Sequence, residues 1–176
     1  MARFGREFRG TLLASAFEIE SIIETILLSA LFPGPDSQLA EQRKFFDEQL
    51  LKRRTNFANK INLLSKAREA ISGLDTIIPE DTIKKLNRAR LVRNDCAHYP
   101  VSLIPDGPAP IAQFKAVLCG AENDTELNAE NVNDIYQLFY QLTHDLNEAA
   151  RAIGKGALAP SATPPATPRS QAPSQP

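Results

Sequence analysis

The sequence predicts an all-α protein, an antiparallel bundle of four or five helices. Apolar residues recur every three or four positions through four long stretches, as they do on one face of a helix. Prolines or glycines follow these stretches and predict where the helices end. The chain has 176 residues, of which 43% are hydrophobic and 23% are charged, so it can bury a core as one domain without disulfides or metals.

Three helices are predicted in the first half of the chain. The first spans about residues 8–32 and ends at Pro33-Gly34-Pro35. The second covers residues 37–51, and the third covers residues 56–72 and stops at Gly73. Four residues of the second helix are expected on its inner side, namely Phe45, Phe46, Gln49 and Leu50.

Two more helices and a short hairpin are predicted in the second half. Pro79 begins a helix that runs to about His98, and acidic residues occupy its first turn. Residues 100–111 contain four prolines and are expected to be a loop. A weaker pattern predicts a β-hairpin near 113–127, with residues 113–119 paired to residues 125–127. The last helix begins near Asn128 and stops at Gly154.

The composition changes at residue 154 and divides the chain into a helical domain, 1–153, and a tail, 154–176. The tail consists mainly of Pro, Ala, Ser, Thr and Gly, so it has little apolar surface to offset the entropy of ordering. We therefore expect it to be disordered. It is either a solubilising tail or a ligand for a polyproline-binding domain.

Several classes of protein are excluded by the residue counts. Glu18, Glu20 and Glu24 interrupt the first apolar stretch, so it is neither a signal peptide nor a membrane span. We expect a cytoplasmic protein whose two cysteines stay reduced and unpaired. Two cysteines and two histidines cannot supply a clustered zinc site, so no metal and no cofactor is expected.

The formal net charge of −1 conceals a strong separation of charge along the chain. Residues 43–93 hold thirteen basic and six acidic residues, a net charge of +7. Residues 94–153 hold two basic and nine acidic residues, a net charge of −7. The basic block permits a nucleic-acid partner. It is equally compatible with solvated helix faces that the acidic last helix balances in the folded molecule.

The most informative segment is the end of the helix that starts at Pro79, residues 90–100, which read RLVRNDCAHYP. Arg93 and His98 lie five residues apart, about 140° around an ideal helix, so they share no stripe unless the helix frays. Asn94 and His98 lie four apart and do share one. Cys96 is expected to pack inward as a small apolar residue.

The segment Arg93-Asn94-x-x-Ala97-His98 resembles the R-N-x-x-x-H signature of HEPN domains, which are compact helical bundles. Two other segments agree with this resemblance. Residues 16–24 are similar to the long, acid-bearing first helix of that fold, and residues 57–64 are similar to an F-x-x-K-I-x-L segment in relatives of the mannitol-operon repressor. The resemblance covers about residues 8–153 in pattern, but only Arg93–His98 is a motif.

The resemblance implies a metal-independent ribonuclease in which two protomers place both Arg–His sets in one cleft. Arg93, Asn94 and His98 are the implied catalytic residues. An imidazole exchanges protons near neutral pH, and a guanidinium matches the oxygens of a phosphate. Asn94 would orient the phosphate or the imidazole. Because a protomer has only His98 in this region, a homodimer is expected to supply both the acid and the base.

Three further residues are candidates for binding or support. Arg90 belongs to the basic block, and Tyr99 is the one aromatic residue placed to stack on a base. Glu20 borders the apolar stripe of the first helix, and Arg93 is its natural cationic partner. Glu20 and Glu24 could otherwise hold a metal, but no further ligand stands at bundle spacing.

The main candidate residues could also have a structural role in place of a functional one. Arg93 can form a surface ion pair with Asp95 or with an acid of the first helix. His98 can cap the last carbonyls of its helix. His144 is expected to be an exposed helix residue.

Two functions are compatible with these residues. The first is an endoribonuclease that cleaves single-stranded RNA, as a toxin or defence component with an antitoxin partner. The second is a non-catalytic regulatory module similar to the mannitol-operon repressor, acting through protein contacts. No membrane partner is expected.

Overall fold

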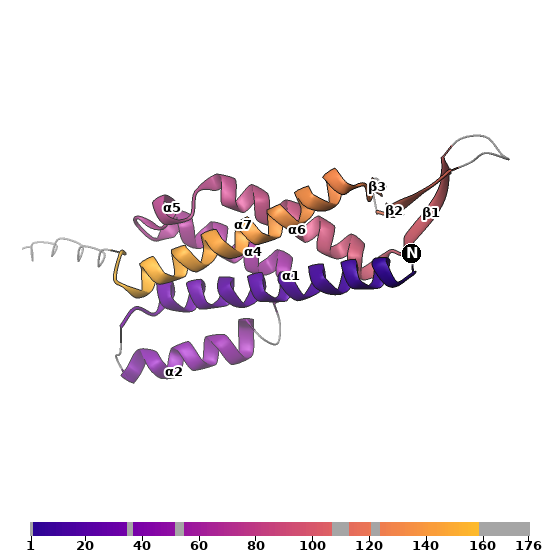
Figure 1. Cartoon of the computed structure of the whole chain (residues 1–176). Coiled ribbons are helices and arrows are strands. Elements are labelled where there is room, and N and C mark those ends of the chain that lie inside the picture. The colour runs from indigo at the N-terminus through magenta and orange to yellow at the C-terminus, as the bar shows by residue number, and fades with distance from the viewer. Residues whose placement is uncertain (1, 35–36, 52–54, 107–112, 121–123, 159–176) are drawn as a thin grey trace, which may run out of the picture.

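The computed structural model describes residues 2–34, 37–51, 55–106, 113–120 and 124–158. Most of them are helical, and a small antiparallel sheet extends from the end of the bundle at which α1 begins (Figure 1). The predicted helical fold with a short hairpin is thus confirmed in outline, but the described residues form six α-helices instead of four or five, and three paired strands. In chain order the elements are α1 (Ala2–Leu31), α2 (Ser37–Phe45), a π-helical segment η1 (Phe46–Leu51), α4 (Phe57–Ala70), α5 (Leu74–Ile77), α6 (Glu80–His98), β1 (Val101–Asp106), β2 (Gln113–Leu118), β3 (Thr125–Glu126) and α7 (Ala129–Gly154).

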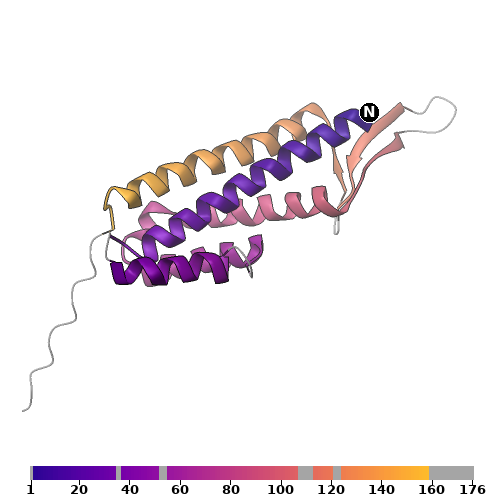
Figure 2. The same ribbon diagram turned by 90° about the horizontal axis from the view of Figure 1, so that it is seen from below.

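The two longest helices, α1 and α7, lie side by side and run in the same direction, while α6 runs against both (Figures 1 and 2). The long helices that follow one another in sequence are antiparallel, but α1 and α7, the two helices in the most extensive contact, are parallel (Figures 1 and 2). The largest fully buried side chains of α1 are Phe8, Leu12, Ile19, Ile23, Ile26 and Leu27. Among the described residues, no helix has the length and apolar character that crossing a bilayer takes.

Local capping explains why several predicted helix ends agree with the structure. The Asn56 Oδ1 atom accepts a hydrogen bond from the Asn59 amide at 2.9 Å, and Asn128 Oδ1 accepts one from the Asn131 amide at 2.8 Å. Pro79 directly precedes α6, as predicted. Of the predicted tail, residues 159–176 lie outside the described residues.

The predicted second helix is wrong in its detail. It is α-helical only to Phe45, and η1 follows it. A π-helical turn adds a residue to each turn, so the side chains beyond it rotate to a new face. Phe45, the last residue of α2, is 65% exposed instead of inward, whereas Phe46 packs against the core. At the end of η1, Leu51 is fully buried. The side chain of Leu50, also predicted to face inward, lies outside the described part of the structure.

The predicted loop at 100–111 is also wrong in its first part, because Val101–Asp106 form strand β1. The rest of that loop, residues 107–112, lies outside the described residues. The expected pairing of β2 with β3 is confirmed, with Leu118 opposite Thr125. β1 pairs with the other edge of β2, so β2 is the central strand.

The hydrogen-bond pattern of the sheet explains how a strand tolerates Pro105. The Cys119 amide donates to the Pro100 carbonyl at 3.2 Å, so the backbone of Pro100 faces β2. Every second residue of a strand directs its backbone groups to the same neighbour, so those of Ser102 and Ile104 face β2 as well. Pro105 directs its backbone away from β2, where its missing N–H breaks no bond of the sheet.

Candidate functional site

The last three turns of α6 position the predicted site. The buried residues of this helix form a stripe of Thr82, Ile83, Leu86, Ala89 and Cys96. Arg93 comes four residues after Ala89 and three before Cys96, so it occupies a core position of this stripe. The fold therefore holds an arginine, half-buried, where the pattern would place an apolar side chain.

Four of the predicted residues lie within an arc of about 140° around α6. Starting from Arg93, the positions of Arg90, Asn94 and His98 follow at about 60°, 100° and 140° around the helix. We call these four residues the α6 flank. The helix does not fray, because the Tyr99 amide bonds to the Asp95 carbonyl at 2.9 Å. Arg93 and His98 are therefore on different faces, as predicted, and Asn94 lies between them.

The Arg93 side chain is poorly satisfied. Its Nη1 donates to Asn94 Oδ1 at 3.3 Å, and its buried Nε has no hydrogen-bond partner among the described residues. The predicted alternative, an ion pair to Asp95 or to an acid of α1, is not found in the described part of the chain. His98 is exposed. A half-buried guanidinium with only a neutral amide for a partner retains its capacity to bind an anion.

Arg9 fixes the end of α6, and sequence reasoning missed it. Its Nε donates to the Cys96 carbonyl at 2.6 Å, and its Nη2 donates to the Ala97 carbonyl at 3.5 Å. These carbonyls belong to the last helical turn, which leaves such acceptors unpaired. Arg9, not His98, caps them. No local pattern could have found a contact across 87 positions of sequence.

Cys96 packs inward as predicted, and both cysteines are free. Burial raises the pKa of the Cys96 thiol to about 11; the nearby Arg9 charge opposes this effect, and Asp95 adds to it. The thiol is therefore protonated at neutral pH and is a packing group rather than a nucleophile.

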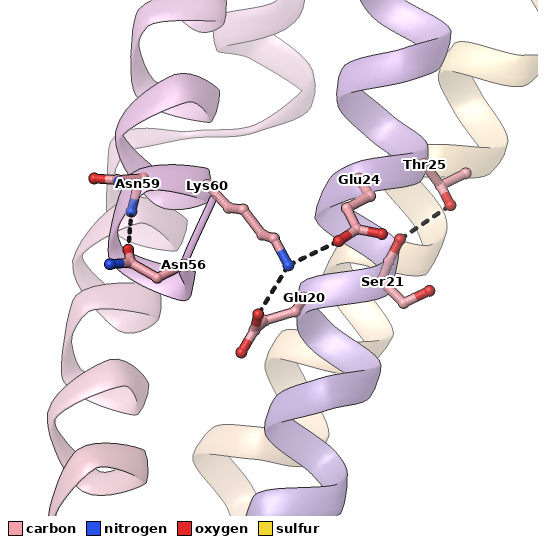
Figure 3. A network of polar contacts seen from close by, with 7 residues as sticks. All are labelled: Glu20, Ser21, Glu24, Thr25, Asn56, Asn59 and Lys60. Carbon is pink, nitrogen blue, oxygen red and sulfur yellow. Dashed lines mark hydrogen bonds and ion pairs between the residues drawn. The ribbon is translucent and has the colours of Figure 1, made fainter. Parts of the chain in front are cut away.

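Glu20 does not contact Arg93, and that prediction is wrong. Lys60 of α4 lies between two carboxylates of α1, with its Nζ 2.9 Å from Glu20 Oε2 and 2.7 Å from Glu24 Oε1 (Figure 3). The reason is the packing of α4 against this part of α1. Lys60 lies three residues after Phe57 and four before Leu64, both buried, and that spacing was the signal for an inward lysine.

Lys60 is only 6% exposed, and its charge is compensated by the two acids. Burial lowers the pKa of Lys60, but hydrogen bonds to Glu24 and Glu20 outweigh it, so the pKa is raised above its usual value. Within the described residues, no three His, Cys, Asp or Glu side chains gather as ligands for a metal.

The other predicted residues do not join the α6 flank. Tyr99 is half-buried and caps α6 in an extended conformation. His144 is exposed on α7, as expected, with its Nδ1 3.5 Å from Asp145 Oδ1. Compared with protein-family models, curated proteins and solved structures, the chain matches none of them. The case for a site rests on the residues of α6.

Proposed function

We propose that this protein is a metal-independent endoribonuclease of the HEPN kind, which binds and cleaves single-stranded RNA at the α6 flank. The observation that carries the proposal is Arg93. The fold keeps a guanidinium in an apolar stripe with a neutral amide for a partner and a buried donor unsatisfied. Such an arrangement is unfavourable for stability, and an RNA phosphate supplies the anion that relieves it.

The chemistry uses the ribose 2′-OH as the nucleophile. A histidine removes the 2′-OH proton, the 2′ oxygen bonds to phosphorus, and the bond from phosphorus to the 5′ oxygen breaks. A second histidine protonates the leaving 5′ oxygen, and the products carry a 2′,3′-cyclic phosphate and a 5′-OH. Arg93 stabilises the charge on the phosphate, and Asn94 orients it. His98 is the histidine of this flank, so a second protomer provides the other one.

A second function, a regulatory module that acts through protein contacts, is favoured by two observations. Arg93 and His98 lie on different faces of α6, and Leu91, 49% exposed, projects from the same part of the helix. An exposed leucine beside polar residues suits a protein contact as well as an RNA.

The experiment compares wild type with His98→Ala and Arg93→Gln on an end-labelled single-stranded RNA in the presence of EDTA. We expect wild type to give fragments ending in a 2′,3′-cyclic phosphate. Each variant should lose at least about a hundredfold in rate, the usual contribution of a general acid or base or of charge stabilisation. His144→Ala, the other histidine of the chain, is the matched control and should cleave normally.

Expression of wild type, but not of His98→Ala, should also arrest growth if the protein is a toxin or defence component. A wild-type protein that forms a stable dimer and leaves RNA intact at every concentration contradicts the proposal and favours the regulatory module.

A further inference from the structure

Helix α6 ends in a way that leaves two of its last carbonyl groups without the usual helical donors. Inside an α-helix, the carbonyl of a residue accepts a hydrogen bond from the amide four residues later. For Cys96 that residue is Pro100, which has no N–H. For Ala97 it is Val101, which already belongs to strand β1. These two carbonyls therefore need donors from elsewhere in the molecule.

Arg9 of α1 supplies these donors. Its Nε donates to the Cys96 carbonyl at 2.6 Å, and its Nη2 donates to the Ala97 carbonyl at 3.5 Å, so the first bond is the stronger. We call these two bonds the Arg9 contact. The guanidinium is charged, and it lies at the end of the helix where the dipole is negative. The Arg9 contact therefore does for the last turn of α6 what the proline at position 100 cannot do.

The turn that Arg9 holds is the one that carries His98. Cys96 and Ala97 directly precede this histidine, so a change in their backbone moves the imidazole. Arg93 lies one turn earlier, where the regular bonds of the helix do not involve Arg9. Loss of the Arg9 contact would therefore displace His98 relative to Arg93. Cleavage requires both side chains to contact one phosphodiester at the same time, so this relative placement matters for the chemistry.

We propose, on the basis of the ribonuclease function proposed above, that Arg9 is a positioning residue of the α6 flank. It holds His98 at a fixed distance from Arg93 through the backbone of the last turn, and it contacts neither the RNA nor the reacting atoms. Misplacing a catalytic group by about 1 Å costs up to about a hundredfold in rate. Arg9 therefore acts on the chemical step rather than on the affinity for RNA.

The first test is the Arg9→Met variant in the RNA cleavage assay. Methionine keeps an unbranched stem and removes every donor. The maximal single-turnover rate should fall at least about tenfold. The RNA concentration that gives half of this rate should change less than about twofold. An arginine that binds RNA directly would show the opposite pattern, with a higher half-saturating concentration and a similar maximal rate.

Three further variants separate positioning from a loss of charge or of fold. Arg9→Lys keeps a cationic donor and should restore the maximal rate to within about threefold of wild type. Arg9→Gln keeps a neutral donor where Nε lies and should give an intermediate rate, which tests the proposal even where Arg9→Met unfolds. Arg3→Met makes the same change at an exposed position of α1 and is the matched control, which should cleave as wild type does.

Two measurements on protein that does not cleave complete the test. In His98→Ala protein, adding Arg9→Met should leave the salt slope of RNA affinity unchanged, whereas a lost phosphate contact would reduce it by about 0.7. Without RNA, the Tyr99 amide, which bonds to the Asp95 carbonyl, should exchange its hydrogen at least about tenfold faster in Arg9→Met. The Ala89 amide, in the middle of α6, is the control and should exchange as in wild type.

The results distinguish this proposal from the function on which it rests. If wild type cleaves RNA and Arg9→Met cleaves as fast, the role of Arg9 is wrong and the ribonuclease stands. Faster cleavage by Arg9→Met also overturns this role, because the Arg9 contact would then hold His98 away from Arg93. A reduced salt slope overturns it in favour of a direct RNA contact. If wild type leaves RNA intact, the ribonuclease is wrong, and the role of Arg9 in it is wrong as well.

Discussion

Lys60 is buried in the bundle and Arg93 is half-buried on α6, and the surroundings of these two cations differ. Lys60 lies between the carboxylates of Glu20 and Glu24, at hydrogen-bond distance from both. Arg93 has a single amide for a partner. A buried charge is tolerated when it is paired, and it is expensive when it is not. At the level of single residues, Lys60 therefore stabilises the fold, whereas Arg93 is retained at a cost in stability.

Lys60→Met should destabilise the protein by about 3–5 kcal/mol, because it leaves two buried carboxylates without their cation. Urea denaturation followed by circular dichroism measures this free energy. The triple variant that adds Glu20→Gln and Glu24→Gln is the control, and it should recover most of the loss. A loss below about 1 kcal/mol, typical of a surface pair, would contradict the buried role.

The same pair predicts a dependence on alkaline pH. The pKa of Lys60 is raised in the folded state, so the protonated form contributes stability in full below the unfolded lysine pKa of about 10.4. That contribution is lost as the pH rises through the higher folded value. The difference in stability between wild type and Lys60→Met should therefore be constant from about pH 8 to 10 and shrink above that range.

Residue placements that depend on helical spacing could be predicted from the sequence. Cys96 packs inward, His144 is exposed, and Arg93 and His98 diverge around α6. The contacts of Arg9 and Lys60 could not be predicted, because each joins residues far apart in the chain. Glu20 was correctly expected to need a cation, but spacing along α1 does not say which helix brings it.

At the scale of elements, α1 contains two glycines that differ in their surroundings. A Cβ atom on Gly10 would meet nothing within 4 Å, whereas one on Gly5 would lie 3.2 Å from the Cβ of Val101. Gly10→Ala should therefore stabilise the protein by roughly 0.5–1 kcal/mol through helix propensity. Gly5→Ala should gain less, because Val101 must shift. Thermal melts of the two single variants measure the two gains in stability. Equal gains would contradict this prediction, because they would mean that Val101 of β1 shifts without a cost in free energy.

Elements were predictable where their ends are marked locally. Asn56, Gly73, Pro79 and Asn128 each mark the start of a helix or the turn before it. Strand β1 was missed because its prolines indicate a loop, and only the pairing with β2 shows that Pro105 interrupts no bond. Segment η1 was missed because a π-helical turn has no signal in the apolar spacing.

At the scale of the whole molecule, the separation of charge along the chain gives the proposed RNA contact a measurable signature. Log-affinity for a single-stranded RNA should fall linearly with log salt concentration, as counterions are released. Arg90→Gln, on the α6 flank, should reduce the slope by about 0.7, the value for one phosphate contact to a single strand. These measurements use His98→Ala protein so that the RNA stays intact.

Arg151→Gln is the matched control for this slope. Arg151 lies near the far end of α7, where it pairs with Glu148 at 2.6 Å. Its removal should leave the slope unchanged. An equal decrease of the slope for both variants would mean that RNA binds basic residues anywhere on the surface, with no preference for the α6 flank.

The parallel packing of α1 on α7 has a consequence for synthesis. α1 is synthesised before the other described helices, and α7, which packs against it more extensively than any other element does, is synthesised after them. Until residues 129–154 have emerged, Leu12, Ile19 and their neighbours lack part of their packing partners. While the segment between α1 and α7 is being synthesised, part of the apolar side of α1 therefore stays uncovered, and the core is complete only after α7 has emerged.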